Sequence, residues 1–143
     1  DGMIIPNKEQ FMFDIDEMAK GLPGGFFVYE ATGSERLLYI SESMANLFKC
    51  DSVNEFRDHV GNSFRGIVHP DELEAVEEKI RKQQFSTKDN ENHTDYVRYR
   101  IVCKDGTEKW VDDFGRLVHD TTFGDVYYVF LLDLEDRIFS GRN

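Results

Sequence analysis

The chain has 143 residues, of which 28 are acidic and 17 basic, so its formal net charge is −11 at pH 7. With 40% hydrophobic residues it can form the core of one domain, which excludes an intrinsically disordered chain. The negative charge argues against nucleic acid and anionic membrane surfaces as partners. The longest apolar run, Val126 to Leu132, is far shorter than the about 20 residues of a membrane-spanning helix. Cys50 and Cys103 form no disulfide framework or CxxC pair, so we expect a cytoplasmic protein.

The first third of the chain predicts one helix and two strands. Asn7 is a good N-cap for a helix over Lys8–Lys20. Short apolar runs bounded by glycine or turn residues then predict strands at Phe26–Ala31 and Arg36–Ile40. The apolar stripe of the predicted helix consists of Phe11, Ile15 and Met18.

The middle of the chain predicts short helices followed by one longer helix. One short helix follows Ser41, and a second is expected at Val53–His59, where Ser52 and Glu55 have the spacing of a capping box. The string His69-Pro70-Asp71-Glu72 predicts the start of the longer helix, because proline suits the first helical position and carboxylates favour the positive end of the helix dipole. We expect this helix to reach Gln84.

Three long strands complete the predicted fold, at His93–Lys104, Thr107–Asp120 and Phe123–Glu135. Asp105-Gly106 is a strong hairpin signal between the first two. Helices grouped before a run of strands are typical of the α+β class. The sequence therefore predicts a five-stranded antiparallel sheet with helices on one face and an amphipathic helix at the N-terminus.

The last strand is apolar on both faces, which a half-exposed strand should not be. By alternation, Tyr127, Val129 and Leu131 share one face, and Tyr128, Phe130 and Leu132 share the other. We therefore expect a cover on both sides of the sheet. The second cover is either the N-terminal helix or a partner chain, and ordinary sheet packing without a partner is the remaining alternative.

Several local strings, taken together and in this order, resemble those of a PAS domain, in the subgroup with a His-Pro-Asp helix start and an Asp-Gly…Trp hairpin. The resemblance implies a sensory or dimerisation module at 21–136, a flanking helix at 1–20, and the start of a linker at 137–143. It also implies an attached output domain such as a diguanylate cyclase or a histidine kinase. The matching strings are Gly24-Gly25-Phe26, Tyr39-Ile40-Ser41, Val68-His69-Pro70-Asp71-Glu72, Tyr99-Arg100-Ile101, Lys104-Asp105-Gly106-Thr107, Lys109-Trp110-Val111 and Leu132-Asp133-Leu134-Glu135.

The same resemblance argues against a flavin or a heme. The string Gly61-Asn62-Ser63-Phe64-Arg65 has no cysteine where flavin-binding PAS domains of the LOV type carry one. Ile101 and Val111 stand where those domains place amides that bind the flavin. No histidine has a convincing inward position on the long helix, as an axial heme ligand requires, and no paired metal ligands are found. We expect a colourless protein, with an unidentified small molecule as the only candidate ligand.

PAS folds enclose a cavity between the long helix and the sheet. Candidate lining residues are Leu73, Val76, Ile80, Tyr99, Ile101, Val111, Asp113, Val129 and Leu131. Each is more often plain core than a ligand contact. Asp113 stands out because alternation turns a carboxylate inward. It is either a polar anchor for a ligand or, more commonly, a buried carboxylate paired with an arginine or a backbone N–H.

The leading hypothesis is a non-catalytic input module. The alternative is a small cone-shaped α+β enzyme related to ketosteroid isomerase, with Asp113 as the base, and a third reading is an interaction scaffold without a ligand. We also expect a homodimer, because the outer face of the sheet carries more aromatic surface than one short helix covers. Its candidate interface residues are Phe11, Ile15, Met18, Trp110, Phe114, Tyr128 and Phe130.

Overall fold

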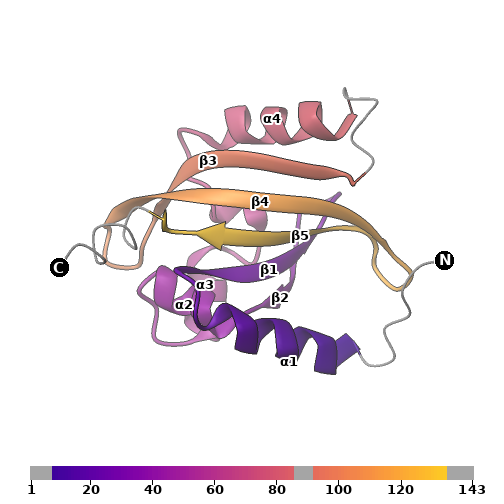
Figure 1. Ribbon diagram of the computed structural model, residues 1–143. Helices are drawn as coiled ribbons and strands as arrows, with labels where there is room; N and C mark the ends of the chain where they lie inside the picture. Colours follow the sequence, from indigo (N-terminus) through magenta and orange to yellow (C-terminus); the bar gives the residue numbers. More distant parts are fainter. Residues whose placement is uncertain (1–7, 86–91, 135–143) are drawn as a thin grey trace.

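The computed structural model describes residues 8–85 and 92–134 and contains one five-stranded antiparallel sheet. The strand order is β2-β1-β5-β4-β3 (Figure 1). The last strand in the chain therefore lies at the centre of the sheet, beside the first strand and the fourth. The strands are β1 Gly24–Glu30, β2 Leu37–Ile40, β3 Thr94–Val102, β4 Glu108–Asp120 and β5 Gly124–Leu132.

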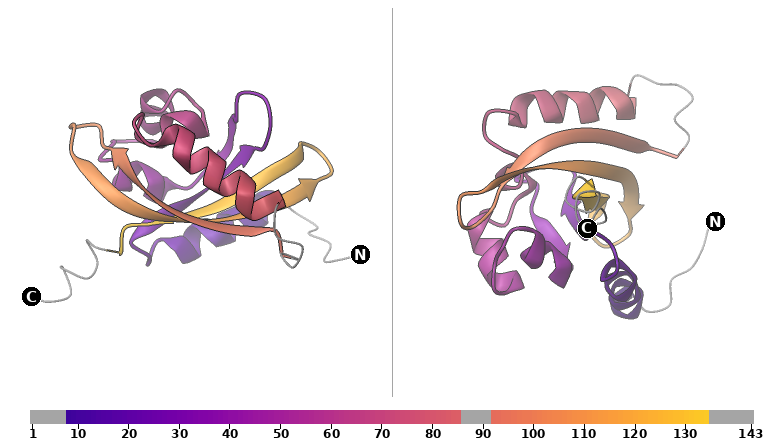
Figure 2. Two further views of the ribbon diagram at one scale, coloured as in Figure 1. Left: turned by 90° about the horizontal axis from the view of Figure 1, so that it is seen from above. Right: turned by 60° about the vertical axis from the view of Figure 1, so that its left-hand side comes forward.

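Helices cover both faces of this sheet, but unequally (Figure 2). The N-terminal helix α1 contacts β1 on one face, which we call the outer face. The remaining helices pack on the inner face. The helices are α1 Lys8–Ala19, α2 Glu42–Leu47, α3 Val53–His59, the 3-10 turn η1 Phe64–Gly66 and α4 Leu73–Phe85. The predicted α+β fold is confirmed, including the five antiparallel strands.

Hydrogen bonds show where α3 and α4 begin. Ser52 caps α3, since its hydroxyl accepts from the backbone N–H of Glu55 at 3.0 Å. The long helix α4 begins at Leu73, three residues later than expected. His69 closes a separate turn, because its carbonyl accepts from Glu72 and its ring Nδ1 accepts from Asp71. Pro70 therefore lies in this turn and not in the helix.

The Asp105-Gly106 signal marks a real hairpin. The ladder bonds of β3 and β4 stop at Val102 and Glu108. The turn between them is closed by the Cys103 N–H, which donates to the carbonyl of Thr107 at 2.8 Å. Gly106 has a φ of +89°, a left-handed conformation that glycine adopts without a steric penalty.

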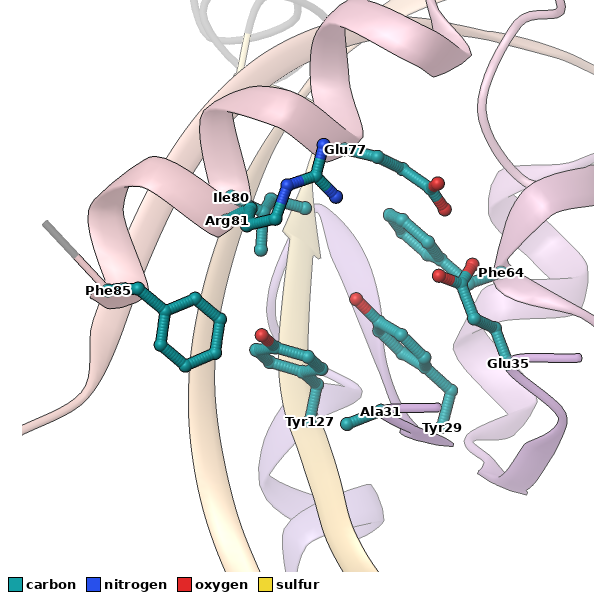
Figure 3. A pocket seen from close by; sticks show the side chains of 9 residues that line it. All are labelled: Tyr29, Ala31, Glu35, Phe64, Glu77, Ile80, Arg81, Phe85 and Tyr127. Atoms are coloured by element: carbon teal, nitrogen blue, oxygen red, sulfur yellow. The ribbon is translucent and has the colours of Figure 1, made fainter. Parts of the chain in front are cut away.

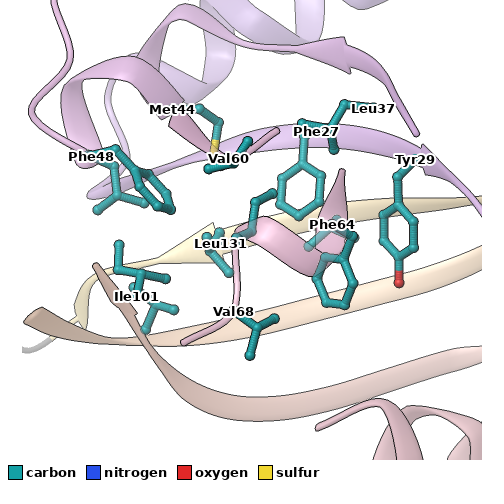
Figure 4. Packing of buried hydrophobic residues seen from close by; sticks show 14 of the residues in the cluster. Phe27, Tyr29, Leu37, Met44, Phe48, Val60, Phe64, Val68, Ile101 and Leu131 are labelled. Atoms are coloured by element: carbon teal, nitrogen blue, oxygen red, sulfur yellow. The ribbon is translucent and has the colours of Figure 1, made fainter. Parts of the chain in front are cut away.

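The main core lies between the inner face of the sheet and the short helices (Figure 4). Phe27 from β1 and Leu131 from β5 meet Met44 and Phe48, which α2 and the residue after it bring onto the sheet. All four side chains are buried. Full burial of one such side chain contributes about 1.5–3 kcal/mol, so this contact area accounts for the packing of the short helices on the sheet.

The outer layer is smaller. Phe26, Val28 and Val126 are buried there, and Ile15 of α1 packs against them. Met18, which the helical stripe placed in the same contact, is 74% exposed. That expectation is wrong, because α1 presents only part of its stripe to the sheet. The side chain of Phe11 lies outside the described part of the structure.

One carboxyl group is sealed inside the core. Asp113 of β4 is 1% exposed and accepts a hydrogen bond from the Tyr99 hydroxyl at 2.6 Å. The partner is therefore a phenol, and not the arginine or backbone N–H that the sequence suggested. Desolvation disfavours the charged form and raises the pKa of Asp113 to about 8. The group is neutral at physiological pH.

We predict that Gly24→Ala destabilises the fold. A Cβ atom on Gly24 would lie 1.8 Å from the carbonyl oxygen of Leu131, whereas one on Gly21 would meet nothing within 4 Å. Relieving such a clash costs about 1–3 kcal/mol. Gly24→Ala should lower the free energy of unfolding by that amount in urea denaturation. Gly21→Ala is the matched control and should leave it unchanged or raise it slightly. Equal stabilities of the two variants would contradict the close pairing of β1 with β5.

Asp113 also predicts how stability depends on pH. Because its pKa is higher in the folded state than in the unfolded state, the folded protein holds the proton that the unfolded chain releases above about pH 4. Unfolding free energy should therefore fall as pH rises from about 4 to about 8.

The measurement compares wild type with Asp113→Asn by chemical denaturation across this range. The wild type should lose at least about 1 kcal/mol more than the variant, since one unit of pKa shift corresponds to about 1.4 kcal/mol. The variant keeps a smaller slope, because the pKa values of Glu35 and Asp95 are also raised by burial. Identical slopes would show that Asp113 is ionised in the folded protein.

Candidate functional site

A pocket of about 150 Å³ lies under α4, where the helix crosses the ends of β1 and β5 (Figure 3). We call it the pocket beneath α4. Its floor is Tyr29 of β1 and Tyr127 of β5, which are paired directly across the two strands. Phe64 of η1 and Ile80 of α4 form its walls, and the small side chain of Ala31 leaves the space open at the end of β1.

The aromatic rings of this pocket form a continuous stack. The Phe64 and Tyr29 ring centroids lie 4.5 Å apart with an interplanar angle of 3°. Those of Tyr29 and Tyr127 lie 5.1 Å apart at 24°. Offset stacks of this kind add about 0.5–1.5 kcal/mol per pair beyond their buried area. The stack therefore gives the pocket preformed apolar walls.

Two carboxyl groups point toward one another at one side of the pocket, beside Phe64 (Figure 3). They belong to Glu77 of α4 and to Glu35 of the turn between β1 and β2. With both groups ionised, Glu35 Oε1 and Glu77 Oε2 are buried without a hydrogen-bond partner. Burial, followed by the hydrogen bond and the negative charge of Glu77, raises the pKa of Glu35 to about 8. The Glu35 carboxyl group therefore keeps its proton near neutral pH and is hydrogen-bonded to Glu77.

The backbone of Glu35 is held in a conformation that L-residues rarely adopt. Its φ is +57°, in the left-handed region, where a residue other than glycine loses about 1–2 kcal/mol. The carbonyl of Glu35 accepts from the N–H of Phe64 at 3.0 Å, and its own N–H donates to Thr32 at 3.3 Å. These bonds fix the strained turn, which places the Glu35 carboxyl group at the pocket.

The hydroxyl groups of Tyr29 and Tyr127 also face this space (Figure 3). The two residues are only 3% and 8% exposed. Within residues 8–85 and 92–134, neither hydroxyl has a hydrogen-bond partner. Both hydroxyl groups are therefore free to bond water or a ligand in the pocket. Desolvation raises the pKa of Tyr127 to about 12, and the group stays protonated.

Two residues of α4 stand at the opening. Phe85 is 74% exposed. Arg81 lines the pocket, but its guanidinium pairs with Glu78 on the same helix, and its side chain is 59% exposed. A charge in contact with bulk water is strongly screened, so Arg81 does not neutralise the buried carboxyl groups.

The structure distributes the nine predicted pocket residues differently. Ile80 alone among them lines the pocket beneath α4. Leu73 is partly buried, and the other seven are buried in the core: Val76, Tyr99, Ile101, Val111, Asp113, Val129 and Leu131. Asp113 is enclosed by packing and bound to Tyr99, so it has no access to a substrate. The ketosteroid isomerase alternative, which needs an open cavity beside its base, is not supported.

Sequence reasoning missed most of the actual lining. The inward direction of Tyr29 and Tyr127 can be predicted from the sequence, because strand alternation turns both side chains inward. Glu77 follows Val76 on a face that sequence reads as solvent-exposed. No local pattern in the sequence predicts where the Glu35 carboxyl group lies, since its position depends on a left-handed turn.

The outer face of the sheet carries the predicted interface residues. Trp110 and Phe114 are 43% and 44% exposed, and Tyr128 and Phe130 are half-buried. We call these four residues the outer aromatic face. A groove of about 510 Å³ runs beside α1, and Ile15, Phe114 and Phe130 contribute to its lining. The helix α1 therefore leaves part of this face open.

The remaining sequence candidates have structural partners. His69 shares a hydrogen bond with Glu108 at 3.1 Å, and His59 bonds the carbonyl of Val102 at 2.8 Å. In the described ranges, no three histidine, cysteine, aspartate or glutamate residues are grouped as metal ligands. Likewise, no helix among those residues is long and apolar enough to cross a membrane.

Solved structures of several sensory proteins have the same fold. A sensory box histidine kinase/response regulator from Burkholderia thailandensis E264 is 14% identical, with a TM-score of 0.59 over 95% of this chain and 91% of that one. The N-terminal domain of a diguanylate cyclase with a PAS/PAC sensor from Marinobacter aquaeolei is 16% identical, with a TM-score of 0.52 over 80% and 97%. An RNA-binding light-oxygen-voltage receptor is 16% identical, with a TM-score of 0.59 over 96% of this chain and 37% of that one. At these identities the likeness establishes the fold.

Sequence comparison gives the family. No curated protein matches the chain. A family model of the PAS fold, however, matches residues 37–129. This range runs from the start of β2 into β5 and includes α4 and the Asp105-Gly106 hairpin. Since the match spans well over half of the 143 residues, the chain belongs to the PAS fold family.

Proposed function

We propose that this PAS domain is a non-catalytic sensory input module that binds a small molecule in the pocket beneath α4 and controls an attached output domain. The pocket itself carries the proposal. It combines a preformed aromatic stack with the carboxyl groups of Glu35 and Glu77 and the hydroxyl groups of two tyrosines. Concave, mostly apolar sites with a few convergent polar groups are typical of ligand binding.

The structural neighbours support an output domain of the signalling class. Two of them are named as parts of a histidine kinase/response regulator and of a diguanylate cyclase. An output domain of either kind would be attached where β5 leaves the sheet, beyond Leu132. This exit is close in sequence to Tyr127, so pocket and output domain would be joined by a single strand.

The size of the pocket supports the expectation that the domain carries neither flavin nor heme. A cavity of about 150 Å³ is known to suit a ligand of the size of benzene. A three-ring flavin or a porphyrin is much larger. The expected ligand is a small, colourless molecule.

We predict that Ala31→Leu abolishes ligand binding. The added carbon atoms would occupy the open end of the pocket. Ala75→Leu makes the same change on the exposed side of α4 and is the matched control. Mass spectrometry of molecules released by denaturing freshly purified protein should find a small molecule with wild type and with Ala75→Leu. Ala31→Leu should retain at least about tenfold less, a loss of about 1.4 kcal/mol.

Two results would contradict this prediction. One is an equal amount of the small molecule with Ala31→Leu, which would place it elsewhere. The other is the absence of any bound molecule from wild type together with no thermal stabilisation by a metabolite library. The domain would then act as a scaffold without a ligand.

We further propose a homodimer through α1 and the outer aromatic face. Large exposed apolar patches mark interaction sites, and Trp110 and Phe114 of β4 remain more than 40% exposed. A second copy of the domain would cover them. Nucleic acid is a less suitable partner for this face of an acidic chain.

Light scattering at micromolar concentration should give twice 16.7 kDa for the wild type. Phe114→Glu should return the mass of the monomer, because it buries a charge in the interface. Phe123→Glu is the control, since Phe123 is 46% exposed in the turn before β5 and lies off the face. A wild type that stays monomeric would refute the homodimer for this domain.

A further inference from the structure

We propose that the ligand of the pocket beneath α4 is a small organic cation with N–H donors, of the primary ammonium class. This inference rests on the proposed sensory function and specifies its chemistry. It follows from the polar atoms that converge on the pocket, from the faces of the aromatic rings and from the size of the space.

The pocket gathers groups that can accept hydrogen bonds, namely the carboxyl oxygens of Glu35 and Glu77 and the hydroxyl groups of two tyrosines. Once both carboxyl groups are ionised their oxygens only accept, and Glu35 Oε1 and Glu77 Oε2 are then buried without a hydrogen-bond partner. The hydroxyl groups of Tyr29 and Tyr127 can both accept, and neither has a partner in the described part of the chain. A primary ammonium brings three donors and no acceptor. It would bring both donors and a positive charge to the two carboxylates, whereas a neutral ligand lacks the charge and an anionic ligand is repelled.

The aromatic stack favours the same class of ligand. The faces of tyrosine and phenylalanine rings attract cations within about 6 Å of the ring centre. The stack of Phe64, Tyr29 and Tyr127 lines the pocket beside the two carboxyl groups. An ammonium group between the carboxyl groups would therefore have its carbon chain along these rings. The volume of about 150 Å³ limits that chain to a few carbon atoms.

The cationic side chains nearby do not take the place of such a ligand. Arg65 Nε lies 3.6 Å from Glu35 Oε1, too far for a hydrogen bond. Its guanidinium instead donates to the carbonyl of Gly33 at 2.8 Å, and its side chain is 51% exposed. Arg81 is paired with Glu78 at the opening. Both arginine side chains face water, whereas Glu35 Oε1 and Glu77 Oε2 are buried.

Cation binding should displace the proton that the Glu35 carboxyl group holds. Below a pKa of about 8 for Glu35, the proton must leave before the ammonium can bind. Affinity should therefore rise by about tenfold per pH unit up to that value and then level off. The titratable and charged groups around this pair, from every element that packs against it, are Glu35, Arg65, Glu77, Arg81, Tyr29, Tyr127 and, behind the tyrosines, Asp95 and Asp113.

The test uses three probes of similar size: n-butylammonium, its neutral isostere 1-butanol, and tetramethylammonium, which has the charge without donors. Each is titrated into the ¹⁵N-labelled domain, stripped of any co-purified molecule, and amide shifts are followed by NMR. We expect n-butylammonium to bind at least about tenfold more tightly than either of the others at about pH 8, because charged hydrogen bonds are the stronger ones. The strongest shifts should be at Tyr29, Glu35 and Glu77.

Substitutions test the two carboxyl groups. Glu77→Gln keeps the shape of the side chain and removes its charge, and it should weaken n-butylammonium at least about tenfold without affecting 1-butanol. Glu74→Gln removes the same charge from the exposed side of α4 and should leave both affinities unchanged. The probe comparison in wild type needs no substitution, so it decides the question even where a variant folds poorly.

The outcomes separate this inference from the proposed function. Equal binding of n-butylammonium and 1-butanol, or binding that Glu77→Gln does not weaken, overturns the ammonium assignment. A neutral or anionic molecule that co-purifies and is lost with Ala31→Leu also overturns it, while the sensory pocket stands. If no probe shifts the pocket residues and no molecule co-purifies, both proposals fail.

Discussion

The pairing of β1 with β5 is the constraint on which the rest of the structure depends. It joins residues about 100 positions apart in the chain, from Gly24 opposite Leu132 to Glu30 opposite Val126. Closing so long a loop has a large entropic cost, which must be offset by burial along both faces of the two strands. The inner side chains of this pair close the main core, and the outer ones receive α1. Gly24 permits the close approach, because a Cβ atom there would collide with the carbonyl of Leu131.

The same pairing decides where the pocket lies. Tyr29 is registered opposite Tyr127, so two large rings meet at the end of the strands, and Phe64 continues the stack. The next inward position after Tyr29 is Ala31, whose small side chain leaves space, and α4 covers this space. Polar atoms occur where the apolar packing ends: Glu35 from a turn and Glu77 from the helix. In the packed interior, Asp113 accepts a hydrogen bond from Tyr99 and Asp95 accepts one from Gln84. The pocket differs in that its two carboxyl groups face each other, and Glu35 Oε1 and Glu77 Oε2 have no hydrogen-bond partner once both are ionised.

Much of the fold could be predicted from the sequence, because it follows from local patterns. Alternation placed Asp113 inward and Phe114 outward, and their exposures of 1% and 44% agree. The capping residue of α3 and the Asp105-Gly106 hairpin also depend on nearby residues alone. The start of α4 was placed too early, because His69 and Glu72 form a turn of their own before it.

The pocket was not predicted, because it depends on relations that no local pattern encodes. The expected lining consists of inward positions of the strands and α4, but these side chains pack against one another and fill the space between them. Tyr99, Ile101 and Val111 are 0% exposed. The actual lining requires the register of β1 against β5 and the left-handed turn at Glu35. Both are tertiary features, and only the inward direction of Tyr29 and Tyr127 could have been read in advance.

Consecutive residues of β5 connect the two faces of the sheet, although the faces have different roles. Tyr127 belongs to the pocket, and the next residue, Tyr128, belongs to the outer aromatic face. The ring of Tyr128 lies 5.9 Å from that of Phe26, and Ile15 of α1 packs in the same cluster. A change in the position of the Tyr29–Tyr127 pair would thus reach α1 through one residue of β5 and one ring contact. A ligand shifts such an arrangement only by binding one form more tightly than the other. Its contact with Tyr127, and not its total affinity, would therefore determine how strongly the outer face responds.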